Sequence, residues 1–275
     1  MTRKVDTDRK VVLITGTTSG FGKLTAERVA ADGHLVYGTQ TPNSNVTSPG
    51  PGKLLELDVR DEDLARSCID QVIGEAGRLD VLVNNAGMGV FGATEDVGID
   101  AAENQFDVNY FGTLRMIRAA LPHMRKAGTG TIINFGSFAG RIALPFQSHY
   151  SATKAAVEIM TEALRLEIHG TGVEATVVSP GDFHTGFSAA RKVIAGADSD
   201  FYQAKRNACF DAVNKSELNG LDPAMLGELI ATIISSRKIK PRYSIGTFEQ
   251  RVALRLRGLL PDGALEPLVR RTFDI

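Results

Sequence analysis

The sequence predicts an α/β fold with a doubly wound, mostly parallel sheet of seven strands and helices on both faces. Short β-branched apolar runs alternate with longer stretches whose apolar residues recur every three or four positions, which is the pattern of strand–helix–strand units. The first run, Lys10–Ile14, leads directly into a glycine-rich turn and a helical pattern. The other strands are predicted within Gly33–Thr39, Lys53–Val59, Asp80–Val83, Gly130–Ser137, Val173–Val178 and Arg242–Gly246.

Length and charge favour one domain that acts on small molecules. The 275 residues suffice for one large α/β domain with a full core. A formal net charge of -1 provides no overall field for nucleic acid or an anionic membrane. The polar start of the chain and the lack of a long apolar run predict a cytoplasmic protein without a membrane span. Cys68 and Cys209 lack metal-ligand spacing, so we expect buried thiols and no metal.

Three glycines, Gly16, Gly20 and Gly22, lie between the first strand and the first helix. Glycine lets the backbone approach a ligand closely, and a helix N-terminus offers N–H groups and a positive dipole end to a pyrophosphate. A tight turn without a ligand is the alternative. The position directly after the first strand favours a nucleotide site.

Polar residues also follow the second, third and fourth strands. Gln40 and Thr41 stand where an acidic residue would bind the ribose hydroxyls of a dinucleotide. Asp58 is placed to bind an adenine amino group, with a solvated strand-end carboxylate as the alternative. The amides of Asn84 and Asn85, followed by Ala86 and Gly87, suit a ligand contact and the bracing of neighbouring strands equally well.

Tyr150 and Lys154 are the strongest candidates for acid–base chemistry. If Tyr150 opens a helix, Lys154 lies one turn later on the same face, where its ammonium would lower the pKa of the phenol. Ser137 ends the preceding predicted strand and belongs to the same sheet edge. Asn109 interrupts the apolar pattern of a long predicted helix, Ala101–Lys126. Such an Asn binds a buried backbone carbonyl or serves in catalysis.

The rest of the chain is predicted to be mostly helical. Asp182–Lys215 has no clear strand and is interpreted as a helical lid over the substrate. Asp222 and Pro223 are a helix start signal. The Arg- and Leu-rich tail predicts an amphipathic helix with a solvated basic face, and a membrane or partner surface is the alternative.

Residues from about 10 to 185 resemble the short-chain dehydrogenase/reductase family. Thr15-Gly16-x-x-x-Gly20-x-Gly22 resembles its cofactor turn, and Asn84–Gly87 resembles its sheet-stabilising motif. The resemblance extends to its catalytic tetrad, matched by Asn109, Ser137, Tyr150 and Lys154, and to its nicotinamide-side loop, matched by Pro180, Gly181 and Thr185. It implies a single-domain Rossmann fold with a cofactor and catalytic core at 10–185, a substrate lid at 186–220 and C-terminal helices with the last strand at 221–275.

The resemblance implies hydride transfer between a nicotinamide cofactor and a secondary alcohol, ketone or aldehyde. Tyr150 would exchange a proton with the substrate oxygen, and Ser137 would hold that oxygen by a hydrogen bond. Lys154 would bind the nicotinamide ribose and lower the pKa of Tyr150, and Asn109 would hold a water that links Lys154 to solvent. The implied cofactor-binding residues are Gly16, Thr18, Ser19, Gly20, Phe21, Gly22, Gln40, Thr41, Asp58, Val59, Asn85, Ala86, Gly87, Tyr150, Lys154, Pro180, Gly181 and Thr185.

Three departures from the family pattern bear on specificity. Ser19 and Thr41 stand where NADP-preferring members carry a basic residue, and Gln40 stands where NAD-preferring members carry Asp. The cofactor is therefore NADP or NAD, with a slight lean to NADP. Gly136 stands where a second Ser is common, which would enlarge the pocket beside Ser137.

The apolar residues of the second half favour a lipophilic alcohol or ketone, although core packing explains them equally well. They are Leu144, Pro145, Phe146, Phe183, Phe187, Phe201 and Tyr202. The alternative function is a catalytically silent dinucleotide-binding regulatory protein. A sugar-nucleotide epimerase or dehydratase is disfavoured because the segment after Gly181 is too short for its substrate domain. The resemblance also implies a homodimer or homotetramer.

Overall fold

A parallel sheet of seven strands forms the centre of the molecule. The computed structural model describes residues 9–42, 44, 52–184, 191–194, 200–259, 261–273 and 275. The strand order is β3-β2-β1-β4-β6-β7-β9, with every neighbouring pair parallel. The strands are β1 (Val11–Ile14), β2 (Leu35–Gln40), β3 (Lys53–Glu56), β4 (Val81–Asn84), β6 (Gly130–Phe135), β7 (Val173–Pro180) and β9 (Arg242–Ile245). The predicted doubly wound fold is confirmed.

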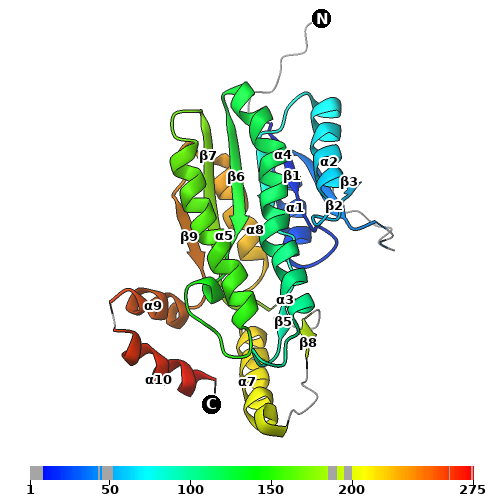
Figure 1. Ribbon diagram of the computed structural model, residues 1–275. Coiled ribbons are helices and arrows are strands. Elements are labelled where there is room, and N and C mark those ends of the chain that lie inside the picture. Colours follow the sequence, from blue (N-terminus) through cyan, green and yellow to red (C-terminus); the bar gives the residue numbers. More distant parts are fainter. Residues whose placement is uncertain are drawn as a thin grey trace, which may run out of the picture.

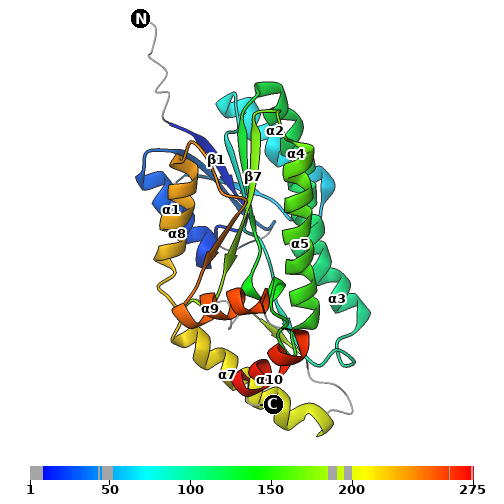
Figure 2. The same cartoon turned by 90° about the vertical axis from the view of Figure 1, so that its left-hand side faces the viewer.

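Helices cover both faces of this sheet (Figures 1 and 2). One face packs against α1 (Gly20–Ala31) and α8 (Ala224–Ser235), and the other against α2 (Glu62–Ala76), α4 (Gly112–Ala127) and α5 (Ser148–Glu167). Successive residues of a strand point to opposite faces. Val11 and Leu13 therefore enter one core cluster, whereas Val12 and Ile14 enter the other. Burial on both faces explains why β1 is a continuous apolar run.

The carboxyl ends of the strands meet at one edge of the sheet, where α7 (Asp200–Leu218), α9 (Phe248–Arg257) and α10 (Asp262–Thr272) also lie (Figures 1 and 2). The strand order reverses between β1 and β4. Ligands of doubly wound sheets bind in the crevice at such a switch point. None of the helices in the described ranges is long and apolar enough to cross a membrane. Cys68 and Cys209 are buried free thiols.

The long helix predicted over Ala101–Lys126 is present in the structure with a π turn within it. It consists of α3 (Ile99–Phe106), a π-helical turn at Asp107–Phe111 and α4. A π turn holds an extra residue per turn and rotates the side chains that follow it. Asn109 lies in this turn and is 1% exposed. The predicted long helix is therefore present without a break from Ile99 to Ala127, and the π turn within it is the feature that the sequence pattern did not predict.

Three other boundaries differ from the predictions. Helix α5 begins at Ser148, so Tyr150 lies within its first turn and does not open it. The lid segment contains a short strand, β8 (Lys192–Val193), paired with β5 (Val90–Phe91). The tail forms two helices, since α9 ends with Gly258 as its C-cap residue and Pro261 is the N-cap residue of α10.

Candidate active site

A cavity of about 1640 Å³ opens at the carboxyl edge of the sheet. Ordinary small-molecule pockets measure roughly 300–1,000 Å³, so this cavity has room for two ligands at once. Its strand-end half is lined by the segments that follow β1, β2, β3 and β4. Its helical half is lined by α7, α9 and α10 together with the segments that follow β6 and β7.

The glycine-rich turn after β1 forms one wall of the strand-end half. Gly16 and Gly20 have positive φ of 70° and 53°, a conformation that suits glycine. Gly22 is buried beneath the turn, where a Cβ would lie 2.1 Å from the carbonyl oxygen of Gly16. The turn therefore requires all three predicted glycines, although Gly22 does not line the cavity.

The amides after β4 brace the turn and the sheet. Asn85 Nδ2 donates hydrogen bonds to the carbonyls of Thr15 at 2.8 Å and Gly16 at 3.1 Å. Asn84 Nδ2 donates to Asn134 Oδ1 at 2.8 Å. Bracing is thus the role these side chains have in the structure, while Asn85, Ala86 and Gly87 also line the cavity.

Helix α1 points an uncapped N-terminus at the cavity. It begins at Gly20, and its N-cap residue Ser19 makes no side-chain capping hydrogen bond. Thr18, Ser19, Gly20 and Phe21 line the cavity here. Free N–H groups and the positive end of the helix dipole suit a phosphate group.

The tips of β2 and β3 form the outer end of the strand-end half. Gln40, Thr41, Asp58 and Val59 all line the cavity, as predicted for a cofactor site. Gln40 Oε1 is buried and has no hydrogen-bond partner among the described residues. A buried acceptor of this kind calls for a ligand donor.

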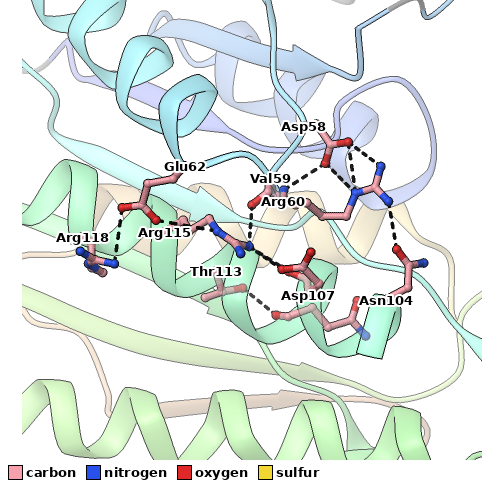
Figure 3. A network of polar contacts seen from close by, with 10 residues as sticks. Asp58, Val59, Arg60, Glu62, Asn104, Asp107, Thr113, Arg115 and Arg118 are labelled. Atoms are coloured by element: carbon pink, nitrogen blue, oxygen red, sulfur yellow. Dashed lines mark hydrogen bonds and ion pairs between the residues drawn. The ribbon is translucent and has the colours of Figure 1, made fainter. Parts of the chain in front are cut away.

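Arg60 is a cavity residue that sequence reasoning missed. Figure 3 shows its guanidinium bound to Asp58, with Nη2–Oδ2 at 2.6 Å, and reaching Asn104 Oδ1 with Nη1 at 2.9 Å. The hydrogen bonds from Arg60 hold the pKa of Asp58 below its usual range. Asp58 is therefore an ion-paired carboxylate at the cavity and not simply a solvated one, and its contact with adenine stays a prediction. The signal available in the sequence was a guanidinium two residues after the strand-end carboxylate.

Tyr150, Ser137 and Lys154 are brought together at this cavity. Lys154 Nζ lies 5.9 Å from the centroid of the Tyr150 ring and donates to the carbonyl of Phe135 at 2.9 Å. Ser137 is hydrogen-bonded to the Tyr150 side chain, and its Oγ accepts from Ala139 N at 3.1 Å. The predicted one-turn spacing of Tyr150 and Lys154 therefore holds.

The pKa of Tyr150 moves in the direction opposite to the prediction. Burial raises it, while the hydrogen bond from Ser137 and the charge of Arg191 counteract that rise. Burial also lowers the pKa of Lys154, to about 8. The prediction counted the attraction between the two groups and not the loss of water around both, which disfavours each charged form.

Asn109 has a bracing role in the structure. Its Oδ1 accepts from Met88 N at 2.8 Å, and its Nδ2 donates to Met88 O and Thr153 Oγ1, each at 3.0 Å. Of the two alternatives for this residue, binding to buried backbone is the one observed. The side chain is buried behind the cavity wall and holds the loop after Gly87 against α5.

Gly136 lines the cavity next to Ser137, and its lack of a side chain also leaves space for a neighbouring group. A Cβ there would lie 2.8 Å from Glu158 Oε1, so the glycine makes room for a buried carboxylate and does not simply widen the pocket. Glu158 lies one turn after Lys154 and is 2% exposed. It accepts from Ser179 Oγ at 2.8 Å and pairs with Arg242 at 3.0 Å.

Comparison with known proteins decides the family. A family model described as short chain dehydrogenase matches residues 10–193. A 3-ketodihydrosphingosine reductase from Bacteroides thetaiotaomicron is 38% identical over 269 residues, which are 97% of this chain and 98% of that protein. The chain belongs to the short-chain dehydrogenase/reductase family.

Solved structures agree with this assignment. A short-chain dehydrogenase from Streptomyces avermitilis superposes with a TM-score of 0.81 at 30% identity, covering 96% of each chain. The closed form of a serine dehydrogenase complexed with NADP+ gives a TM-score of 0.73 at 27% identity, covering 87% of this chain and 95% of that one. This short-chain dehydrogenase is therefore an oxidoreductase that uses a nicotinamide dinucleotide.

The strand-end half of the short-chain dehydrogenase fits that cofactor. The uncapped N-terminus of α1 suits its diphosphate, and the unpartnered Gln40 Oε1 suits a ribose hydroxyl. Pro180 and Gly181 line the same cavity. Thr185 lies outside the described residues.

The predicted apolar wall is only partly correct. Leu144 and Phe183 line the cavity, whereas Phe146 packs into a separate cluster with Phe91 and Cys209. Phe201 is 80% exposed. Pro145 and Tyr202 lie outside the lining as well, and Phe187 is not among the described residues. The apolar residues that line the helical half include Ile142, Val213, Val252, Ala253, Leu256, Leu268, Val269 and Phe273.

Proposed function

We propose that this short-chain dehydrogenase interconverts a long-chain, amphipathic ketone and its secondary alcohol, with NADP(H) as the cofactor. One observation carries the proposal: a single cavity joins Tyr150, Ser137 and Lys154 to an apolar helical half. A site for small, polar substrates has no need of such a wall. The apolar residues from α9 and α10 suit an alkyl chain.

Tyr150 is the acid–base group of the proposed reaction. Because burial raises its pKa, the phenol is protonated at neutral pH and can donate to the substrate oxygen as a ketone is reduced. Ser137, hydrogen-bonded to the same phenol, is placed to donate to that oxygen as negative charge develops on it. The cofactor, when bound, supplies the hydride for reduction or accepts it in oxidation.

Lys154 provides the positive charge beside the phenol. A pKa of about 8 leaves most of this amine protonated at pH 7. The ammonium then stabilises the phenolate that remains after proton transfer. A Cβ at Gly87 would be 3.7 Å from Lys154 Nζ, so the ammonium adjoins the strand-end half and is placed to bind the cofactor.

NADP is the cofactor that the tip of β2 favours. Gln40 and Thr41 are neutral, and an acidic residue that would repel a 2′-phosphate is missing from both positions. Arg60 adds a guanidinium to the same end of the cavity. Solved neighbours are bound to NADP+ and to NAD, so the choice of NADP depends on the residues at this end of the cavity.

Two observations support the proposed substrate class: the apolar lining of the helical half and the similarity to one relative. The 3-ketodihydrosphingosine reductase matches 97% of this chain. Its printed substrate is a long-chain ketone with a polar head. We infer a substrate of the same kind for this protein.

Exposed apolar residues on α5 and beside α4 support the predicted homo-oligomer. Phe111 is 45% exposed, Ile159 65% and Leu166 80%. Large exposed apolar side chains on neighbouring helices suit an interface between subunits. We propose that these helices pair across it.

A chain-length series tests the proposed function. Purified protein is given NADPH and 3-ketones of increasing alkyl length, and oxidation of NADPH is followed. We expect kcat/KM to rise by up to about fourfold with each added methylene until the helical half is filled, because each buried CH₂ contributes about 0.8 kcal/mol. Equal kcat/KM for short and long ketones, or no turnover with either, would refute the proposal.

A further inference from the structure

A group of polar side chains interrupts the apolar wall of the helical half. This polar cluster consists of Asp182, Arg191, Ser216, Glu217 and Gln250, all of which line the cavity. Asp182 follows β7, Arg191 precedes β8, two members belong to α7 and one to α9. Four separate segments thus bring their polar groups to one place.

The cluster holds more negative than positive charge. Arg191 and Glu217 form an ion pair with side-chain exposures of 2% and 13%. Asp182 Oδ2 instead accepts from two neutral donors, Ser216 Oγ and Gln250 Nε2, the latter at 2.7 Å. Two carboxylates and one guanidinium leave one net negative charge. Burial raises the pKa of both carboxylates, and the charge of Arg191 counteracts that rise in each.

This charge acts on the catalytic phenol. Asp182 and Glu217 both raise the pKa of Tyr150 through their charges, whereas Arg191 lowers it. A negative charge near the reacting oxygen opposes the negative charge that develops there during reduction of a ketone. The cluster is therefore poorly matched to a neutral head group. A positively charged group on the substrate, close to the carbonyl, would offset the net negative charge of the cluster.

Two further polar groups of cavity-lining residues have no hydrogen-bond partner among the described residues. Gln147 is 3% exposed, lines the cavity three residues before Tyr150, and its Nε2 is buried without a partner among the described residues. Glu217 Oε2 is also buried without a partner in that part of the chain. Such groups are costly unless a ligand satisfies them. Both indicate that a ligand with polar groups enters the cavity.

We propose that Asp182 binds an ammonium group on the carbon next to the substrate carbonyl, so that the substrate is a long-chain 2-amino ketone. This inference rests on the proposed ketone-reductase function and names its substrate class more narrowly. Asp182 is the carboxylate of the cluster whose side-chain donors are neutral, whereas Glu217 is neutralised by Arg191. A charge-assisted hydrogen bond to an ammonium is the strong form of this contact.

The test compares two ketones in two variants. The substrates are 3-ketodihydrosphingosine and an analogue of equal chain length that lacks the amine, both with NADPH. Asp182→Asn removes the charge but keeps an oxygen that accepts from Ser216 and Gln250. Asp211→Asn, at an exposed position of α7, removes the same charge outside the cavity and is the control.

We expect the wild-type protein to favour the amino ketone by at least tenfold in kcat/KM. Asp182→Asn should abolish most of that preference by raising KM for the amino ketone, with little change for the analogue, and the control should retain it. Equal kcat/KM for the two ketones in the wild-type protein would overturn the inference while leaving the ketone-reductase function intact. An equal loss with both ketones in Asp182→Asn would also overturn it, because Asp182 would then only brace the lid. No turnover of either ketone by the wild-type protein would instead refute the proposed function itself.

Discussion

The strand-end half of the cavity is formed by loops held within a few residues of buried parallel strands, whereas the helical half is formed by helices from the last third of the chain. In the first, the backbone of the glycine-rich turn forms one wall, braced by hydrogen bonds from Asn85, and side chains such as Gln40 and Arg60 line the outer end. In the second, side chains of α7, α9 and α10 form the wall and are joined by contacts such as Arg191–Glu217. A binding site formed by backbone atoms tolerates few substitutions, because an added side chain displaces the backbone. A site formed by side chains on helices can acquire a different ligand specificity when those side chains are substituted.

The largest effect on ligand binding is expected at the glycine-rich turn, whose backbone forms one wall of the cavity. Gly22→Ala places a methyl group 2.1 Å from the Gly16 carbonyl oxygen, so the turn must move and NADPH affinity should fall at least tenfold. The NADPH affinity is measured by fluorescence titration. Gly74→Ala is the control, because a Cβ there meets nothing within 4 Å. It should leave affinity unchanged and stabilise α2 by roughly 0.5–1 kcal/mol. Equal NADPH affinity in both variants would contradict the backbone-wall account.

A smaller effect is expected in the helical half. Leu256→Ala shortens an apolar side chain of α9 that lines the cavity, and KM for a long-chain ketone should rise about fivefold. A short-chain ketone and NADPH should bind as before. Leu218→Ala, at a 66% exposed position outside the lining, should have no effect on steady-state kinetics. If Leu256→Ala weakened the binding of NADPH and of the ketone equally, the two halves of the cavity would not bind their ligands independently.

The smallest effect concerns the charge behind the catalytic lysine. Glu158 raises the pKa of Lys154 against the burial that lowers it to about 8. Glu158→Gln removes that charge, so the ammonium should be lost at lower pH. We expect the alkaline limb of the pH profile of kcat to move down by roughly half a unit to one unit.

Glu162→Gln is the matched control for that shift. Glu162 also pairs with Arg242 but is 50% exposed, so water screens its charge. The alkaline limb of the pH profile of kcat should stay in place in Glu162→Gln. An unmoved limb in Glu158→Gln would show that Lys154 titrates independently of this carboxylate.

The same contrast explains what the sequence could predict. The glycine turn, the strand ends and the one-turn spacing of Tyr150 and Lys154 depend on a few consecutive residues, and the structure brings them together as expected. The helical half depends on packing between distant segments. Phe146 and Leu256 are both apolar, yet one belongs to a separate core and the other to the cavity wall.

The sequence also did not predict the electrostatic environment of the site residues. The pKa of Tyr150 depends on burial, on Ser137 and on Arg191, and a residue spacing describes none of these. The pairing of Arg60 with Asp58 and Asn104 likewise joins the end of β3 to α3 (Figure 3). Such contacts arise only when the fold is complete.

The most direct measurement compares cofactor binding and turnover in Tyr150→Phe. The substitution removes the hydroxyl and keeps the ring beside Lys154. We predict an NADPH affinity within about twofold of the wild-type protein, and a fall in kcat of at least a hundredfold with a long-chain ketone, the scale of a lost acid–base group. A kcat within a few-fold of the wild-type value would contradict the assignment of Tyr150 as the proton donor.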